Sequence, residues 1–157
     1  MTNKAYKTTF ESLEDMQSYV GKEIGLSEWL SIDQDMINQF AMLTKDEQWI
    51  HCDPERSATH SPFKTTIAHG FLVVSFFSHF LETCVDLKGG KMGVNYGFDK
   101  LRFTNSVAVD AKIRARFKLL EVVPRDGGAR FKYGVSIEIE GQEKPACVAE
   151  WLGLVYV

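Results

Sequence analysis

The sequence predicts an α+β fold in which a long, buried central helix is wrapped by an antiparallel β-sheet. Two features of its hydrophobic pattern support this prediction. Residues 70–87 are apolar around most of a helical circumference, whereas the segments after Gly90 alternate between apolar and polar residues with a period of two. An antiparallel sheet with one apolar face must cover that face, and the apolar helix is the element available to do so.

Composition limits both the size of the fold and the class of partner. A chain of 157 residues with 11 Phe and 3 Trp can bury one sizeable core, and no repeat or linker divides it. We therefore expect residues 1–157 to form a single domain, in which the polar residues 1–9 are flexible. The net charge is −3, with acidic and basic residues interspersed, so nucleic-acid binding has no electrostatic support.

The cysteines and the apolar segments indicate a soluble, cytoplasmic protein. Cys52, Cys84 and Cys147 are widely separated and form no C-x-x-C motif, which favours reduced thiols over disulfides or zinc. The N-terminus lacks the apolar core of a signal peptide. Polar residues interrupt the longest apolar run after Val74, far short of a membrane span, so we expect no membrane partner.

The N-terminal part of the chain predicts two helices before the apolar one. Apolar spacing indicates a short amphipathic helix over residues 10–20, with Gly21 at the position of a C-cap glycine, and residues 23–32 indicate a strand. Ser31 or Asp33 can then cap a second helix. The residues of this helix expected to face inward are Met36, Ile37, Phe40, Ala41 and Leu43.

The second half of the chain predicts consecutive antiparallel strands. Alternation is clearest over residues 109–119 and 131–139, and Arg125-Asp126-Gly127-Gly128 between them has the composition of a hairpin turn. Residues 92–103 and 146–157 supply two further strands. The polar residues of the apolar helix form one narrow stripe, which we assign to water or to a partner subunit: Ser75, Ser78, His79 and Glu82.

Asp46 and His51 are the first candidates for chemistry. Five residues on a continuous helix correspond to a rotation of about 140°, so the two side chains converge only if the helix ends between them. Asp53-Pro54 shortly afterwards agrees with broken structure. A converged pair can hold one water and move protons to and from it. The alternative is a surface aspartate and an ordinary loop histidine.

The start of the apolar helix is the second candidate. A helix beginning at Gly70 offers unpaired N–H groups and a positive dipole end to an oxyanion, and glycine permits close approach of a carbonyl. The alternative is an ordinary N-cap glycine. We expect His69 to be a hydrogen-bonding structural residue. The hydroxyl groups of Ser75 and Ser78 either position the Asp46–His51 pair or lie on a solvated helix face.

These motifs together resemble the MaoC-like family of (R)-specific enoyl-CoA hydratases, also called hydratase 2. The family pattern is matched by Asp46-Glu47-Gln48-Trp49-Ile50-His51 and by Pro62-Phe63-Lys64-Thr65-Thr66-Ile67-Ala68-His69-Gly70. The subgroup typified by nodulation protein N is most similar, through Gln48-Trp49-Ile50-His51, Asp53-Pro54-Glu55-Arg56 and Ser61-Pro62-Phe63. The resemblance is densest over residues 40–105. Many hydratases have Asn-Pro where this chain has Gln48-Trp49, so their acyl-chain preference does not transfer.

The resemblance implies a hot-dog fold and a hydro-lyase activity. The expected reaction is reversible syn addition of water to a trans-2-enoyl thioester, giving an (R)-3-hydroxyacyl thioester. Asp46 and His51 would be the catalytic pair, and Gly70 would donate its backbone N–H to the thioester carbonyl. Ser78, His69 and Trp49 would support the site or contact the substrate. The resemblance implies a homodimer, a substrate carried by coenzyme A or acyl carrier protein, and no separate cofactor or metal.

Two questions remain open at the level of the sequence. The first is the role of six basic residues on the predicted strands, which either contact the phosphates of coenzyme A or, as we prefer, form a solvated strand face: Lys100, Arg102, Lys112, Arg114, Arg116 and Lys118. The second is the reaction itself. The alternatives are a hot-dog acyl-CoA thioesterase and a non-catalytic acyl-thioester-binding dimer. Glu82, the acid in the predicted helix before its final turn, lies far from Gly70, which favours the hydratase.

Overall fold

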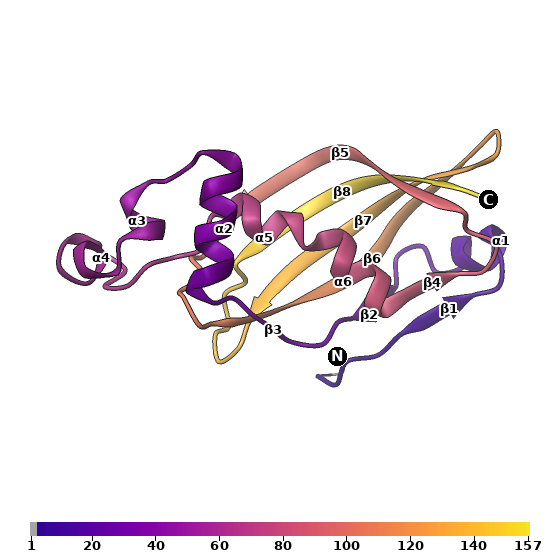
Figure 1. Ribbon diagram of the computed structural model, residues 1–157. Coiled ribbons are helices and arrows are strands. Elements are labelled where there is room, and N and C mark those ends of the chain that lie inside the picture. Colours follow the sequence, from indigo (N-terminus) through magenta and orange to yellow (C-terminus); the bar gives the residue numbers. More distant parts are fainter. Residues whose placement is uncertain (1–2) are drawn as a thin grey trace.

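An antiparallel sheet and two consecutive helices that lie along its inner face form the centre of the computed structural model, which describes residues 3–157 (Figure 1). In sheet order the strands are β2 (Glu23–Leu26), β6 (Lys112–Arg125), β7 (Gly128–Ile139), β8 (Cys147–Tyr156) and β5 (Met92–Phe103), while β3 (Leu30–Ser31) pairs with the start of β6. The core lies between the sheet and the helices, with Phe77 packed edge-on against Trp151 at 5.8 Å. This arrangement confirms the predicted α+β class.

The central helix is shorter than predicted and is divided in two. Helices α5 (Gly70–Ser75) and α6 (Phe77–Cys84) are separated by Phe76. The predicted end at residue 87 is wrong, because Val85–Leu87 forms strand β4. This strand pairs in parallel with β1 (Thr8–Phe10), whose Phe10 side chain is fully buried. Within the described residues, no helix is long and apolar enough to cross a membrane.

Strand β1 also corrects the prediction that residues 1–9 are flexible. Thr8 and Thr9 pair with Val85 and Asp86, and Tyr6 forms a β-bridge with Leu26. Residues 1–2 lie outside the described part of the chain. The helix predicted over residues 10–20 is also wrong at its first residue, because Phe10 lies in β1 and is buried by strand pairing instead of on a helix face.

The first helix is also shorter than predicted, for a local reason. Helix α1 spans only Leu13–Gln17, since the Ser12 hydroxyl accepts a hydrogen bond from the Asp15 N–H at 3.1 Å and so begins the helix after residue 12. Gly21 has φ +87°, a conformation that favours glycine, in the turn that leads into β2.

Helix α2 (Gln34–Thr44) begins as the sequence predicts, with the Asp33 carboxylate accepting from the Met36 N–H at 2.9 Å. Ile37 and Ala41 are buried, four residues apart on one face. Leu43, however, is 80% exposed, so the prediction that it faces inward is wrong. It lies two residues after Ala41, which turns its side chain to the opposite side of the helix.

Two short helices were not predicted. They are α3 (Trp49–Cys52) and α4 (Pro54–His60), and they lie with α2 at one end of the molecule (Figure 1). Asp53 accepts a hydrogen bond from the Arg56 N–H at 2.9 Å, and Pro54 occupies the first turn of α4. Asp53-Pro54 is therefore a helix start, and interpreting it only as broken structure missed this signal.

Strand β6 begins later and ends later than the alternation over residues 109–119 indicates. Asp110 has φ +65° and donates its N–H to the Ile32 carbonyl at 2.7 Å, so the chain turns there and the strand starts at Lys112. The strand then continues to Arg125, and a hairpin at Asp126-Gly127 leads into β7 as predicted, with Gly127 at φ +72°.

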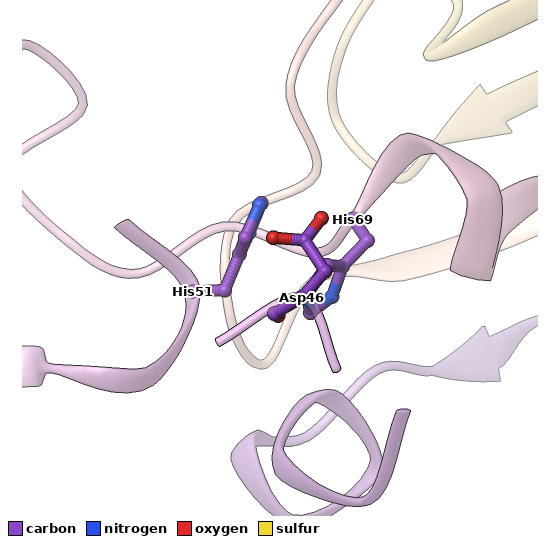
Figure 2. A group of neighbouring side chains, drawn as sticks. All are labelled: Asp46, His51 and His69. Atoms are coloured by element: carbon purple, nitrogen blue, oxygen red, sulfur yellow. The ribbon is translucent and has the colours of Figure 1, made fainter. Parts of the chain in front are cut away.

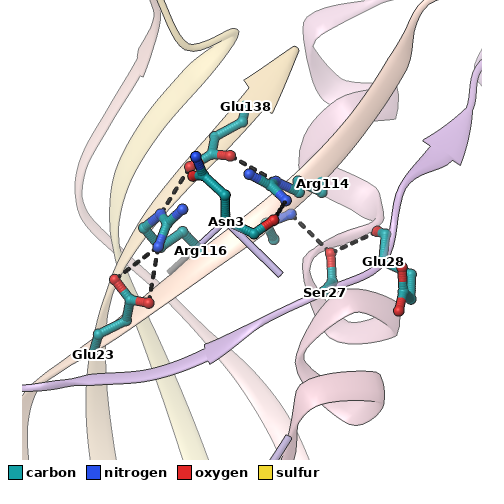
Figure 3. A network of polar contacts seen from close by, with 8 residues as sticks. Asn3, Glu23, Ser27, Glu28, Arg114, Arg116 and Glu138 are labelled. Carbon is teal, nitrogen blue, oxygen red and sulfur yellow. Dashed lines mark hydrogen bonds and ion pairs between the residues drawn. The ribbon is translucent and has the colours of Figure 1, made fainter. Parts of the chain in front are cut away.

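The outer face of β6 carries a network of charges, shown in Figure 3. Glu138 on β7 accepts from Arg114 Nε and from Arg116 Nε, each at 2.7 Å, and Arg116 also pairs with Glu23 at 2.9 Å. The Arg114 guanidinium lies 4.3 Å from the centre of the Trp29 ring. Arg114 is only 6% exposed, so the predicted solvated strand face is wrong at this position: a buried charge needs its partners within the fold.

Candidate active site

A break between α2 and α3 brings Asp46 and His51 together. Lys45 takes a left-handed conformation, with φ 65°, and ends α2, while α3 begins three residues after Asp46 and carries His51. One carboxylate oxygen of Asp46 and one ring nitrogen from each of His51 and His69 lie within 4.8 Å of one another. Figure 2 shows the Asp46 carboxylate beside the two imidazole rings. The geometric condition for convergence, a helix that does not continue from residue 46 to residue 51, is therefore met.

The hydrogen bonding of His51 determines which ring nitrogen carries its proton. The ring is buried, and Nδ1 lies 2.6 Å from the carbonyl oxygen of Ile67. A carbonyl oxygen only accepts, so Nδ1 must carry the hydrogen. In the neutral ring, Nε2 therefore keeps its lone pair and is free to act as a base.

The surroundings of His51 favour the neutral ring. Burial lowers the pKa of His51 below its ordinary value, and the neighbouring His69 lowers it further. The hydrogen bond to the Ile67 carbonyl and the negative charge of Asp46 act in the opposite direction, but the net shift of the pKa is downward. His51 is thus suited to accept a proton at neutral pH.

Two residues that sequence reasoning missed hold the backbone of His51 in place. Gln34 donates from Nε2 to the His51 carbonyl at 2.7 Å, and the buried Thr66 hydroxyl donates to the Gln34 side-chain oxygen. Gln34 thus joins the start of α2 to α3 and to the segment before α5. These contacts link positions up to 32 residues apart, and no local motif marks them.

His69 contacts both members of the pair. It is 3% exposed, its ring stacks on the His51 ring with centroids 3.8 Å apart and planes inclined by 24°, and its Nε2 lies 2.9 Å from the Asp46 backbone carbonyl. The carbonyl can only accept, so Nε2 carries the hydrogen. The hydrogen bond expected of His69 is therefore present, and it is made to the loop that carries Asp46.

The same three residues are a poor arrangement for a metal ion. Each offers one donor atom within 4.8 Å of the others. The lone pair of an imidazole nitrogen lies in the ring plane, so two rings stacked at 24° hold their lone pairs in two separate, nearly parallel planes. Tetrahedral coordination instead needs donors that converge on one point. The geometry of His51 and His69 favours proton transfer over metal coordination.

An open cavity of about 560 Å³ adjoins the pair. His51 lines it directly, whereas Asp46 is not among its lining residues and lies beside the His51 ring. Three exposed aromatic side chains surround it: Phe63, Phe71 and Phe103. Sequence reasoning missed them as site residues, because Phe71 and Phe103 lie in an apolar helix and a strand, where an aromatic residue looks like a core residue, and Phe63 lies in a turn with no chemical motif of its own.

Gly70, the first residue of α5, also lines this cavity. A Cβ atom at this position would lie 2.8 Å from the Phe103 ring, so the close approach of that ring requires glycine. Among the described hydrogen bonds, none involves the Gly70 N–H, which belongs to the first turn of the helix, where amides have no partner within the helix.

The remaining predicted site residues lie elsewhere. Ser78 lines a second cavity, of about 350 Å³, between α6 and strands β5 and β8, and Glu82 lines the same cavity. Neither residue is among those that line the cavity beside His51 and Gly70. The Trp49 ring packs 4.4 Å from the Arg56 guanidinium and is likewise absent from the lining of the His51 cavity.

Cys52 is unsuited to act as a nucleophile, although it follows His51 directly. Burial raises the pKa of its thiol, and the negative charges of Glu47 and Asp46 raise it further. The reactive form of a cysteine is the thiolate, which this environment disfavours.

Comparison with known proteins places this geometry in a family. The MaoC like domain matches residues 15–138. The chain is 42% identical over 143 residues to 3-hydroxyacyl-thioester dehydratase Z of Mycobacterium tuberculosis, covering 90% of this chain and 94% of that protein. It is also 42% identical over 145 residues to nodulation protein N of Rhizobium meliloti, covering 91% and 90%.

A solved structure supports the same assignment. R-hydratase PhaJ1 from Pseudomonas aeruginosa superimposes with a TM-score of 0.67 and 25% identity, covering 87% of this chain and 81% of that chain. The predicted hot-dog fold is thereby confirmed, as is the family expected from the motifs around His51 and Gly70. The chain belongs to the MaoC-like dehydratase family.

Proposed function

We propose that the protein is a hydro-lyase that adds water reversibly to trans-2-enoyl thioesters and forms (R)-3-hydroxyacyl thioesters. The observation that carries this proposal is the convergence of Asp46 and His51 beside a cavity that is also lined by Gly70. The names of similar proteins, a 3-hydroxyacyl-thioester dehydratase and an R-hydratase, support the reaction class.

The pair can hold the water that reacts. A ring nitrogen of His51 and a carboxylate oxygen of Asp46 lie within 4.8 Å of each other. A water oxygen about 2.8 Å from each of two acceptors can bridge a separation of up to about 5.6 Å. Such a water donates one hydrogen to the His51 lone pair and the other to the Asp46 carboxylate, which leaves an oxygen lone pair directed at the substrate.

The reaction then needs only proton transfers and one new bond. As the water oxygen bonds to C3 of the enoyl group, an O–H bond breaks and its proton passes to His51. The electron pair of the C2–C3 double bond moves toward the thioester carbonyl, and C2 takes a proton back from the same pair. Water and proton therefore reach the same face of the double bond, which gives syn addition.

The Gly70 N–H would stabilise the charge that develops on the thioester oxygen. It lies in the first turn of α5, on the wall of the cavity that His51 also lines. A hydrogen-bond donor fixed in place before the reaction stabilises the enolate more than the substrate, which lowers the barrier. Polarisation by an amide and proton transfer by side chains complete the chemistry, so we propose no separate cofactor, with coenzyme A or acyl carrier protein belonging to the substrate.

We further propose that the protein acts as a homodimer. Strand β5 is twelve residues long and, in the described sheet, pairs only with β8. The strand also exposes large apolar side chains: Met92 at 53%, Val94 at 41%, Tyr96 at 57% and Phe98 at 39%. A long apolar edge strand tends to pair with another chain, and a second copy of β5 would continue the sheet.

An enoyl-thioester assay with matched variants tests the reaction. We expect wild-type protein to bleach the absorbance of the conjugated thioester with acyl chains of C4 to C16 and to form the (R) product. Asp46→Asn and His51→Gln should each lower kcat by about 10²- to 10⁴-fold while leaving the fold intact, because each removes one proton-transfer group. The matched controls Asp35→Asn and His60→Gln, both on exposed helix surfaces, should keep wild-type activity.

The same assay separates the alternatives. Release of free thiol would identify a thioesterase. The positions of the acidic residues argue against that reaction, because Glu82 lines the other cavity and the residues that line the cavity beside Gly70 include no carboxylate. Binding of the thioester without any reaction would identify a non-catalytic acyl-thioester-binding dimer. Equal hydration by wild type and by both site variants would rule out the assignment of Asp46 and His51.

A further inference from the structure

His69 is the side chain that joins the two halves of the proposed catalytic pair. Its ring stacks on the imidazole of His51 at 3.8 Å, and its Nε2–H donates to the backbone carbonyl of Asp46 at 2.9 Å. The His69 ring also contacts Phe40 on α2, with ring centroids 5.0 Å apart. His69 is 3% exposed and His51 is 7% exposed, so both rings are enclosed by the fold, whereas Asp46 is exposed.

The two stacked rings carry their protons on different nitrogens. Nδ1 of His51 must donate to the Ile67 carbonyl, whereas Nε2 of His69 must donate to the Asp46 carbonyl. In the neutral His69 ring, Nδ1 is then an acceptor, and it is buried with no hydrogen-bond partner among the described residues. An unsatisfied buried nitrogen costs stability, which points to a role beyond packing.

We propose that His69 is a positioning residue that fixes Asp46 and His51 relative to each other. The N–H bond holds the loop of Asp46 at the site, and the stacked ring prevents the His51 ring from turning away from the cavity. This inference rests on the proposed hydration reaction, and it assigns His69 a function through its neighbours, without contact with the substrate.

A positioning role for His69 can be told from a merely structural one, because His69 also affects the pKa of His51. The titratable side chains whose charged forms act on the His51 ring are the Asp46 carboxylate and, once its ring is protonated, His69. Burial and His69 lower the pKa of His51, while the Ile67 hydrogen bond and Asp46 raise it. Removal of the His69 imidazole therefore takes away one of the two influences that keep the His51 base unprotonated, and the pKa should rise.

Two substitutions separate the two contacts of His69. His69→Phe keeps a ring that can stack on His51 but removes the N–H donor to Asp46. His69→Gln keeps an N–H donor of similar reach but removes the ring. The matched controls are His60→Phe and His60→Gln, because His60 is exposed at the end of α4, where its ring hydrogen-bonds to the neighbouring Thr59 hydroxyl.

We expect both His69 variants to lower kcat by about tenfold or more with KM changed less than threefold, since positioning acts on the chemical step. In both, the acid limb of kcat/KM should move to higher pH, and further in His69→Gln, where water gains access to His51. The His60 controls should match wild type. Wild-type kcat and acid limb in either His69 variant, or a loss of kcat with an unmoved acid limb in both, would overturn the proposal.

Nitrogen-15 NMR of the wild-type histidine rings tests the proposal without any variant. The expected result is the Nδ1–H tautomer at His51 and the Nε2–H tautomer at His69. The same tautomer at both residues would overturn it, even if the variants fail to fold. If wild type hydrates no enoyl thioester, the proposed reaction fails, whereas the tautomers still decide whether His69 holds Asp46 and His51 in this arrangement.

Discussion

The chemistry of His51 depends on which of its two ring nitrogens is held in a hydrogen bond to the protein. Nδ1–H donates a hydrogen bond to the Ile67 carbonyl at 2.6 Å, which leaves Nε2 as the only basic nitrogen of the neutral ring. Protonation of Nε2 would remove the lone pair and place a charge in a buried position. Burial opposes that charge, so the protein keeps its base in the reactive form under conditions where an exposed histidine is partly protonated.

The pH dependence of hydration follows from this shift. The ordinary pKa of histidine is about 6.5, and the pKa of His51 is lower. We therefore expect kcat/KM to be level through neutral pH and to fall only as the pH drops below about 6.5, because protonation removes the base. Measurement with crotonyl-CoA from pH 4.5 to 8.5 checks this expectation. An acid limb centred above pH 7 would contradict it.

Gly70 permits a contact that a larger residue would disturb. A Cβ at this position would lie 2.8 Å from the Phe103 ring, so Gly70→Ala must push the ring away from the helix start. The N–H donor is retained, but the wall of the cavity changes. We expect kcat/KM to fall about tenfold or more through misplacement of the substrate.

A double variant distinguishes displacement of the ring from damage to the helix. Phe103→Ala added to Gly70→Ala removes the clashing ring, and we expect part of the lost kcat/KM to return. The thermal midpoint of each variant serves as the control for folding. A double variant that loses the full product of the two single effects would show that Gly70 and Phe103 act independently.

At the level of elements, residues 92–103 were predicted with the correct bounds, whereas the helices before them were not. Strand β5 is bounded by glycines and polar turns, so local sequence marks both of its ends. Helices α3 and α4 have 4 and 7 residues, and only His51 and Ser57 are buried within them. A helix that buries so few apolar side chains has no hydrophobic periodicity to detect, and its capping residues remain the only signal.

The site was predictable to the extent that it is encoded by contiguous motifs. Asp46 and His51 lie five residues apart, so a short pattern identified them, and the break between the helices met the geometric condition. Gln34 and Phe103 approach the same site from distant segments, through contacts that depend on how α2 and β5 pack. Such residues become recognisable only once the fold is known.

The pairing of β7 with β8 predicts a strong effect of one methyl group on stability. A Cβ at Gly128 would lie 1.9 Å from the Val155 carbonyl oxygen, which is backbone and has little freedom to move. We expect Gly128→Ala to lower the free energy of unfolding by about 3 kcal/mol or more, as measured by urea denaturation. Gly153→Ala is the control, because its Cβ would meet its neighbours at ordinary distances of 3.7 and 3.8 Å.

The control should change the free energy of unfolding by less than about 1 kcal/mol, the usual difference between glycine and alanine in a strand. Equal stability of the Gly128 and Gly153 variants would mean that β7 and β8 can separate enough to accept the methyl group. The pairing of Gly128 with Tyr156, where β7 begins and β8 ends, would then be loose enough to shift.

At the scale of the whole molecule, the helices that build the candidate site and the edge strand β5 lie in different parts of the structure. Helices α2, α3 and α4 gather at one end, where they build the site, while β5 runs along the edge of the sheet (Figure 1). The cavity beside His51 is lined partly by Phe103, the last residue of β5. A second copy paired along this edge would therefore lie close to the cavity, so assembly and activity should be coupled.

Charges placed on the edge of β5 test that coupling. Met92→Lys and Tyr96→Lys replace side chains that are 53% and 57% exposed in the single chain and that we expect to be buried between two copies. We expect light scattering to give twice the mass of one chain for wild type and for Val20→Lys, a control that is 42% exposed and precedes β2, at the opposite end of the sheet from β5. The double β5 variant should have the mass of one chain and a hydration rate reduced by about tenfold or more, since the cavity wall at Phe103 loses its neighbour. A β5 variant that keeps the wild-type mass would place the interface on another surface, and a single chain with full activity would show that the site is complete without a partner.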